Sequence, residues 1–147
     1  MLGRWVSDLE VGDILPVVDY EVTPFLGRDY AHAVESVWER FHSAVGGDPQ
    51  LAPPTLAHVD KLRVLAAACP EGAGPVARMQ LEYDAAHHGP IPVGSRMSVT
   101  GRVESRQARA GRERLVVVFE VRDTATGSLR TRYRDTSLLN FIPEETR

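Results

Sequence analysis

One stretch, residues 52–69, constrains the fold more than any other part of this chain. It opens with Pro53 and Pro54, which prevent a helix before them and fix the direction in which the chain enters the next element. The Thr55 hydroxyl is placed to cap a first helical turn. Apolar or small side chains then recur at helical spacing, at Leu56, Val59, Leu62 or Arg63, Ala66 and Cys69. Alanines on several sides predict a helix that other structure surrounds, and Pro70 ends it.

The segments around this helix are of two kinds. Residues 17–22 alternate as a first strand does, Thr23 is placed to cap a helix after it, and residues 28–44 carry an apolar stripe at helical spacing. After Pro75 the pattern alternates with period two or is rich in β-branched residues, over residues 76–83, 97–105, 115–122 and 129–140. We therefore expect an α+β fold, a single domain over residues 1–147, in which a curved antiparallel sheet wraps a long central helix.

Composition excludes several classes of protein. The formal net charge is −3, so the chain lacks the basic surface that nucleic-acid binding needs. Cys69 is the only cysteine, which excludes an internal disulfide and a cysteine-rich metal site, and His87-His88 has no further ligands at suitable spacing, so no metal is expected. No apolar run is long enough to span a bilayer, and we expect a cytoplasmic protein.

Six short segments, in their order along the chain, resemble a known family. They are Leu-Glu-Val-Gly-Asp at 9–13, Tyr-Glu-Val-Thr at 20–23, Ala-Pro-Pro-Thr-Leu-Ala-His at 52–58, Pro-Ile-Pro-Val-Gly-Ser at 90–95, Thr-Gly-Arg-Val at 100–103 and Phe-Glu-Val-Arg-Asp at 119–123. The chain resembles a MaoC-like hot-dog domain, the fold of (R)-specific enoyl-thioester hydratases and hydroxyacyl-thioester dehydratases. The resemblance implies a homodimer or a heterodimer with another hot-dog chain. It also implies a tunnel for an acyl group carried on CoA or on the phosphopantetheine of an acyl-carrier protein, with no further cofactor.

The start of the central helix is where the resemblance places the thioester. A helix N-terminus offers free backbone N–H groups and the positive end of the dipole, which polarise a carbonyl and stabilise an enolate. The backbone N–H groups of His58 and Val59 are the expected oxyanion donors. The family usually has glycine after this histidine, and this chain has Val59 instead.

The catalytic pair of the family is missing. Active members carry Gly-Asp-x-Asn-Pro, an aliphatic residue and then His, and the aspartate and histidine perform acid–base catalysis. Counted from Thr23, Ser36 stands in place of the aspartate and Phe41 in place of the histidine. Aligned by local likeness, Asp48 takes the place of the aspartate and Pro53 that of the histidine. The first alignment, which turns the motif loop into a longer helix, is preferred.

Other side chains are candidates for the acid–base chemistry. Glu35, Glu39 and His42 would share one side of the predicted helix, either as an acid–base pair or as a solvated face with local ion pairs. Asp48 is either catalytic or a turn residue before a proline. His58 either contacts substrate or satisfies a backbone group. The catalytic candidates are therefore His42, Glu39, Asp48 and His58.

Two further sets of charges have ordinary explanations beside functional ones. Asp60, in the first turn of the central helix, favours the helix dipole. Arg130, Arg132 and Arg134 share one face of the last strand, where they would meet either a phosphate group or solvent.

Three functions stay open. The favoured one is a dehydratase- or hydratase-type carbon–oxygen lyase with a rearranged acid–base set. It would act on a fatty-acyl or polyketide thioester and could include addition of an internal hydroxyl. The second is a hot-dog thioesterase in which Asp48, Glu39 or Asp60 activates water. The third is a non-catalytic subunit that shapes the tunnel for a catalytic hot-dog partner.

Overall fold

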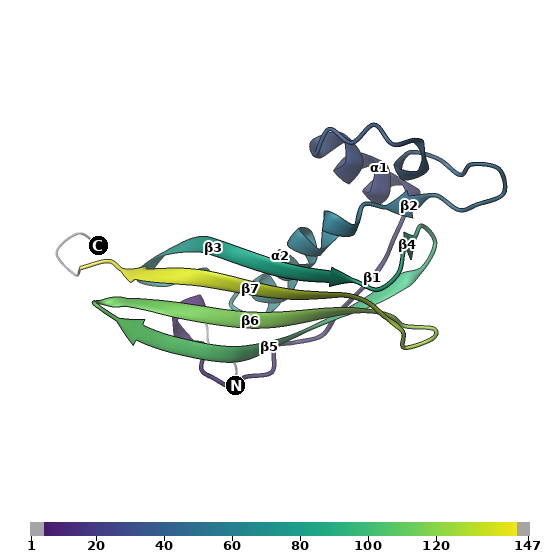
Figure 1. Ribbon diagram of the computed structural model, residues 1–147. Coiled ribbons are helices and arrows are strands. Elements are labelled where there is room, and N and C mark those ends of the chain that lie inside the picture. Colours follow the sequence, from purple (N-terminus) through teal and green to yellow (C-terminus); the bar gives the residue numbers. More distant parts are fainter. Residues whose placement is uncertain (1–4, 144–147) are drawn as a thin grey trace.

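The structure, a computed structural model that describes residues 5–143, is built on a five-stranded antiparallel sheet with strand order β1-β5-β6-β7-β3 (Figure 1). The sheet strands are β1 (Val18–Glu21), β3 (Val76–His87), β5 (Arg96–Arg109), β6 (Arg112–Asp123) and β7 (Leu129–Phe141), while β2 (Leu51–Ala52) and β4 (Ile91–Pro92) form a separate pair. The helices are η1 (Val6–Asp8), α1 (Pro24–Ala33), η2 (Glu39–Phe41), η3 (Pro54–Leu56) and α2 (Ala57–Ala68). The α+β order predicted from the sequence is confirmed.

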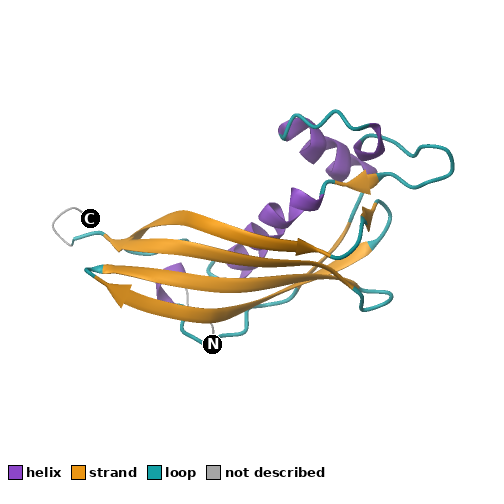
Figure 2. Ribbon diagram, viewed as in Figure 1, coloured by secondary structure: helices purple, strands orange, loops and turns teal. Residues whose placement is uncertain are grey.

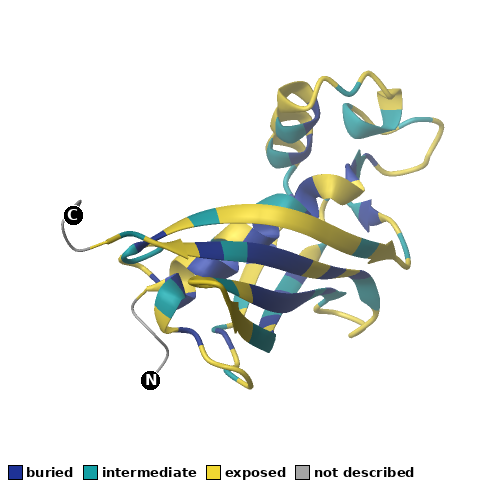
Figure 3. Cartoon of the chain, turned by 60° about the vertical axis from the view of Figure 1, so that its left-hand side comes forward, coloured by how far each residue is buried: buried dark blue, intermediate teal, exposed yellow. Residues whose placement is uncertain are grey.

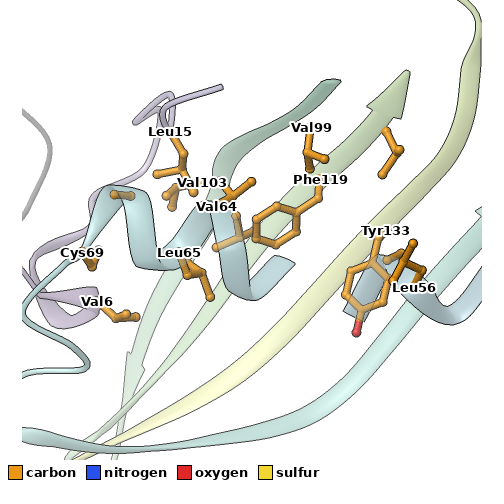
Figure 4. Packing of buried hydrophobic residues seen from close by; sticks show 14 of the residues in the cluster. Val6, Leu15, Leu56, Val64, Leu65, Cys69, Val99, Val103, Phe119 and Tyr133 are labelled. Atoms are coloured by element: carbon orange, nitrogen blue, oxygen red, sulfur yellow. The ribbon is translucent and has the colours of Figure 1, made fainter. Parts of the chain in front are cut away.

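Helix α2 lies against one face of the sheet, and α1 lies beyond one end of it (Figure 2). The alternation predicted over residues 97–105 is confirmed in β5, since Met97, Val99 and Val103 are buried in the core. They pack in one cluster with Val64 of α2 and Phe119 of β6 (Figure 4). The opposite face of the sheet carries charged side chains such as Arg132 and Arg134, and it also holds the buried Val116 and Val118.

Two glycines of the sheet lie at positions that larger residues fit poorly. Ala110 and Gly111, with φ of 53° and 76°, form the two-residue turn between β5 and β6. Gly101 of β5 lies so close to Leu15 and Phe119 that a Cβ there would come within 3.0 Å and 3.2 Å of their side chains. The core therefore approaches the backbone of β5 so closely that a larger residue at position 101 would require Leu15 or Phe119 to shift by a few tenths of an ångström.

Helix α2 is the predicted central helix, but it starts and packs differently from the expectation. The 3₁₀ turn η3 leads into it without a break, and no side chain caps either element, so the predicted Thr55 cap is not formed. The helix buries Val64 and Leu65 against the sheet, whereas Leu62 is 55% exposed. The curved sheet packs on the central helix as predicted, but it covers one side only, and the other side, with Leu62, Ala66 and Ala67, stays exposed.

The predicted helix over residues 28–44 is wrong in its bounds. Thr23 caps α1 through a 3.0 Å hydrogen bond from the Leu26 amide to its hydroxyl, as predicted, so the helix begins earlier. It ends at Ala33, and Glu35 follows with a left-handed φ of 57°. Tyr30 of the expected apolar stripe packs against the core, but the stripe has no packing partner further along, since Val34 is 46% and Val37 is 92% exposed. Because helices of this length depend on packing for their stability, the pattern alone does not extend this one.

Strand β3 forms a long edge with one partner only, β7. Its side chains are largely exposed, and they include Met79 at 62%, Leu81 at 42% and Tyr83 at 53% (Figure 3). An unpaired edge strand that is long and apolar is a surface on which another strand can add. Among the described residues, no helix has the length and apolar character needed to cross a membrane.

Candidate functional site

A cavity of about 130 Å³ lies at the start of α2, between this helix and strands β3 and β7. The helical side contributes Pro54, Thr55, Ala57 and His58, and the strands contribute Tyr83, Ala85, His87 and Tyr133. The sequence folds this way because Pro53 and Pro54 direct the chain into η3, while the alternation of β3 and β7 turns their inner side chains toward the helix. The cavity therefore sits where the open edge of the sheet meets the helix start.

Larger hollows lie on the outer face of the sheet, but they lack this character. One of about 530 Å³ is lined mainly by polar and charged side chains, among them Glu82, Arg114 and Arg134. Arg134 is paired there with Glu104 at 2.7 Å. These charges face solvent, so we place the candidate site in the smaller cavity, which combines apolar walls with few polar groups.

His58 is held in this cavity by two tyrosines. The Tyr133 hydroxyl lies 2.8 Å from His58 Nδ1. The imidazole is nearly perpendicular to the ring of Tyr83, at a centroid distance of 4.7 Å, and to that of Tyr133, at 5.1 Å. The two phenol rings are themselves stacked at 5.4 Å. Tyr133 is buried beside Leu56, the last residue of η3 (Figure 4). One hydrogen bond and two ring contacts thus fix the plane of the imidazole.

A chain of hydrogen bonds continues from Tyr133 into the core. Gln80 Nε2 donates to Tyr133 Oη at 2.9 Å, and Lys61 Nζ donates to Gln80 Oε1 at 3.1 Å. Lys61 also contacts Asp135 at 3.3 Å. Asp135 in turn accepts from Arg78 at 2.9 Å and from Ser137 at 2.9 Å. Helix α2 and strands β3 and β7 are joined through this network, which ends at His58.

The environment keeps the groups nearest the cavity uncharged. Burial, and then the nearby Lys61 ammonium, lower the pKa of His58 below its ordinary value of 6.5. Burial also raises the pKa of Tyr133 to about 12. At neutral pH the site therefore holds a neutral imidazole beside a neutral phenol. Such a pair offers hydrogen bonds to a ligand and carries no charge that a ligand must neutralise.

A second polar group, Asp60, is buried on a different side of α2. Its side chain is inaccessible to solvent, and neither carboxylate oxygen has a hydrogen-bond partner among the described residues. Burial raises the pKa of Asp60 to about 6. The group that acts on it from β1 is the Tyr20 hydroxyl, and burial, followed by the nearby Asp60 carboxylate, raises the pKa of Tyr20. Asp60 does not line the cavity, so its carboxylate cannot meet a ligand bound there.

The predicted acidic candidates lie outside the cavity. Glu39 begins η2 and is exposed, and Asp48 is exposed in the turn where its amide donates to the Val45 carbonyl. His42 Nε2 donates to the Ser36 carbonyl at 2.8 Å, and its ring packs on His32 at 4.8 Å. The predicted helical grouping of Glu39 and His42 is wrong, because α1 has ended before either residue. Catalytic roles for these three side chains stay predictions.

The backbone N–H groups of His58 and Val59 are the predicted oxyanion donors. Since η3 and α2 are continuous, the helical segment starts at Pro54, and the Leu56 amide already bonds the Pro53 carbonyl at 3.0 Å. The amides of His58 and Val59 thus lie beyond the first turn, where carbonyls four residues earlier are the usual partners. Their oxyanion role stays a prediction, and the His58 side chain is the group that reaches the cavity.

Sequence reasoning found His58 but missed Tyr133, Gln80 and Lys61. A signal was present in the last strand. The alternation that places Arg132 and Arg134 on the outer face turns Tyr133 and Asp135 toward the helix. Polar side chains at core-facing positions of a strand need partners, and such partners mark a site.

Comparisons with known proteins agree with this architecture. By sequence, the chain matches no protein-family model and none of the curated proteins. By structure, it is similar to the HadBC (3R-hydroxyacyl-ACP dehydratase) complex from Mycobacterium tuberculosis, with a TM-score of 0.74 and 21% identity over 87% of this chain and 96% of that one. It is also similar to the ChsH1–ChsH2 complex from the same organism, with a TM-score of 0.70 and 15% identity over 89% of this chain and 98% of that one.

A third neighbour is an R-hydratase, PhaJ1 from Pseudomonas aeruginosa, with a TM-score of 0.74 and 13% identity over 95% of this chain and 87% of that one. The fold is therefore α+β of the hot-dog type. The neighbours with this fold include a MaoC-like dehydratase from Rhodospirillum rubrum, and MaoC-like hot-dog domains are the family that the sequence resembles.

Proposed function

We propose that this chain binds an acyl thioester as one subunit of a dehydratase- or hydratase-type enzyme, and that a second hot-dog chain supplies the acid–base pair. The observation that carries this proposal is the combination of a lined cavity with a missing pair. Ser36 and Phe41 in one alignment, or Asp48 and Pro53 in the other, cannot replace an aspartate and a histidine in proton transfer. The chain nevertheless has a cavity at His58.

The chemistry of the cavity suits an acyl thioester. Its walls are mainly apolar and aromatic, and no carboxylate lines it. A neutral His58 can hydrogen-bond the thioester oxygen, and this interaction strengthens as the oxygen gains charge in an enolate-like transition state. The acyl group would be carried on CoA or on the phosphopantetheine of an acyl-carrier protein.

The open edge of β3 supports a second chain as the missing part. Met79, Leu81 and Tyr83 are exposed along it, and Tyr83 also lines the cavity. A strand added to this edge would cover the open side of the site. Two of the similar structures are named as complexes, HadBC and ChsH1–ChsH2. We favour a heterodimer over a homodimer, because two copies of this chain would still lack the pair.

The test is hydration of crotonyl-CoA. The chain alone should bind butyryl-CoA, an unreactive analogue, without hydrating crotonyl-CoA. Mixing it with a hot-dog chain that carries the aspartate and histidine, taken from the same genome, should give hydration faster than that chain achieves alone. Equal rates with and without this protein would contradict the proposal.

A second candidate function is a lyase that works alone with His58 in its acid–base set. The 2.8 Å contact between His58 and Tyr133 favours it, because it holds an ionisable ring at the cavity. Hydration of crotonyl-CoA by the purified chain, lost in His58→Phe, would establish this alternative. Release of free CoA from butyryl-CoA would instead establish a thioesterase, for which the enclosed position of Asp60 and the remote positions of Glu39 and Asp48 are unfavourable.

A further inference from the structure

The hydrogen bonds behind His58 all run in one direction. The Lys61 ammonium can only donate, so the atom of Gln80 that faces it must be the carbonyl Oε1. The Gln80 amide nitrogen therefore faces Tyr133, and it too can only donate. Tyr133 Oη accepts that bond, which leaves its own proton free to be donated to His58 Nδ1, 2.8 Å away.

The order of donors determines which nitrogen of His58 carries the proton. Nδ1 accepts from Tyr133, so it bears the lone pair, and in a neutral imidazole the proton then sits on Nε2. Among residues 5–143, Nε2 has no hydrogen-bond partner, and His58 lines the cavity.

We infer that His58 presents an Nε2–H donor to the cavity, so that the site takes a ligand with a hydrogen-bond acceptor, and that Gln80 and Lys61 are positioning residues that set this polarity. The identity of the acceptor as a thioester oxygen rests on the proposed function. The direction of the hydrogen bonds is independent of the proposed function.

Several contacts keep the polarity from reversing. Lys61 is 4% exposed and is paired with Asp135, which is 1% exposed. The ammonium that donates the first of these hydrogen bonds therefore stays in place. Its charge, together with burial, also lowers the pKa of His58, which favours the neutral ring that the inference requires. The perpendicular contacts with Tyr83 and Tyr133 restrict rotation of the ring.

The inference has a chemical consequence for the reaction. A general base needs a lone pair directed at the proton that it removes, and the lone pair of His58 is directed at Tyr133. His58 therefore acts as an electrophilic hydrogen-bond donor, and the base that removes the α-proton comes from another group. This agrees with a pair supplied by a second chain.

The test is the tautomer of His58, measured in the full chain by long-range ¹H–¹⁵N correlation after ¹⁵N-histidine labelling. His58→Phe assigns the signals, since only those of residue 58 disappear. The wild-type protein should show the Nε2–H tautomer almost exclusively, because one neutral hydrogen bond to Nδ1 adds about fivefold to the preference for Nε2–H that a free histidine side chain already has. An excess of the Nδ1–H tautomer would overturn the inference.

Gln80→Glu is designed to reverse the direction of the hydrogen bonds between residue 80, Tyr133 and His58. A carboxylate at position 80 only accepts, so it takes the Tyr133 proton, and Tyr133 Oη must then accept from His58 Nδ1–H. We expect His58 to change to the Nδ1–H tautomer. The matched control is Gln107→Glu, the same replacement at another exposed strand position that lies away from the cavity, which should leave the wild-type tautomer. The same tautomer in both variants would overturn the positioning role of Gln80.

Gln80→Leu provides a second variant in case the carboxylate disturbs folding. It removes the donor to Tyr133, so the excess of the Nε2–H tautomer should fall toward that of a free histidine side chain while the signals of the other histidines stay unchanged. An unchanged excess would contradict the role of Gln80. Titration with butyryl-CoA separates this inference from the proposed function: a correct tautomer whose Nε2–H signal does not respond to butyryl-CoA overturns the thioester assignment alone.

Discussion

Two neighbouring residues of α2, Asp60 and Lys61, are buried under opposite conditions. Lys61 is 4% exposed and bonds both Gln80 and Asp135. Asp60 is inaccessible to solvent, and its oxygens have no hydrogen-bond partner among the described residues. This difference separates a side of α2 that contributes to the cavity from a side that contributes only to packing. The Lys61 side leads through satisfied hydrogen bonds to the cavity, whereas the Asp60 side leads to Tyr20 and no cavity.

The two sides also differ in what burial costs. A buried charge with partners loses its hydration but regains hydrogen bonds, so removing one partner is expensive. Burial disfavours the charged form of the Asp60 carboxyl by more than the Tyr20 hydroxyl and the Arg63 guanidinium compensate, which is why its pKa rises to about 6. Variants on the two sides should therefore respond differently to mutation and to pH.

The largest expected effect comes from Asp135→Asn on the Lys61 side. It leaves the buried Lys61 ammonium and the Arg78 guanidinium without their anion, and we expect the free energy of unfolding to fall by about 4 kcal/mol. The matched control is Glu120→Gln, which breaks the half-exposed pair with Arg122 at 3.1 Å and should cost less than about 1 kcal/mol. Urea denaturation measures both. Equal losses would remove the distinction between paired burial and surface pairing.

The Asp60 side should respond to pH instead. The native pKa of about 6 exceeds the ordinary value of 3.8, so the native state holds more protons than the unfolded state between these limits. Rising pH therefore removes stability, up to about 3 kcal/mol between about pH 4 and pH 6. Asp60→Asn should abolish this component, so that the difference in unfolding free energy between it and the wild type grows over that interval.

The control for the pH effect is Asp29→Asn, which removes an exposed carboxylate from α1 and should preserve the wild-type pH dependence. Denaturation at a series of pH values compares the three proteins. If Asp60→Asn instead kept the wild-type slope of unfolding free energy against pH, the folded protein would accommodate the charged and the neutral carboxyl of Asp60 equally well. That result would contradict the contrast with Lys61.

A smaller effect is expected from Tyr133→Phe. The buried hydroxyl accepts from Gln80 and contacts His58, so its removal should lower the free energy of unfolding by about 1 kcal/mol. Tyr83→Phe is the control, because Tyr83 stacks on Tyr133 but is 53% exposed, and it should change stability by less than about 0.5 kcal/mol. Thermal unfolding measures the pair, and equal shifts would mean that the hydroxyl contributes nothing to the network.

The sheet and its inward faces were predictable from the sequence. Strict alternation placed Met97, Val99 and Val103 on one face, and Ala110-Gly111 marked the turn that follows, because a one-sided sheet imposes a period of two on its strands. The extent of α1 was not predictable in the same way. Its apolar stripe continues to Val37 and beyond, but a stripe forms a helix only where something covers it.

The candidate site was predictable only in part. His58 stood out because it follows the two prolines at the helix start. The partners of His58 did not stand out in the sequence. Tyr133 lies 75 residues further along the chain and contacts His58 only because β7 pairs within the sheet. Residues joined across such a distance are brought together by topology, which the local pattern does not contain.

The most direct test of the account is the affinity of the chain for butyryl-CoA, measured by calorimetry with the wild type, with His58→Phe and with His32→Phe. His58→Phe keeps a ring in the cavity but removes the hydrogen bond, and we expect it to weaken binding by about tenfold. His32→Phe, an exposed position on α1, should bind as the wild type does. Equal affinity in all three proteins, or no binding by the wild type, would contradict a thioester site at the start of α2.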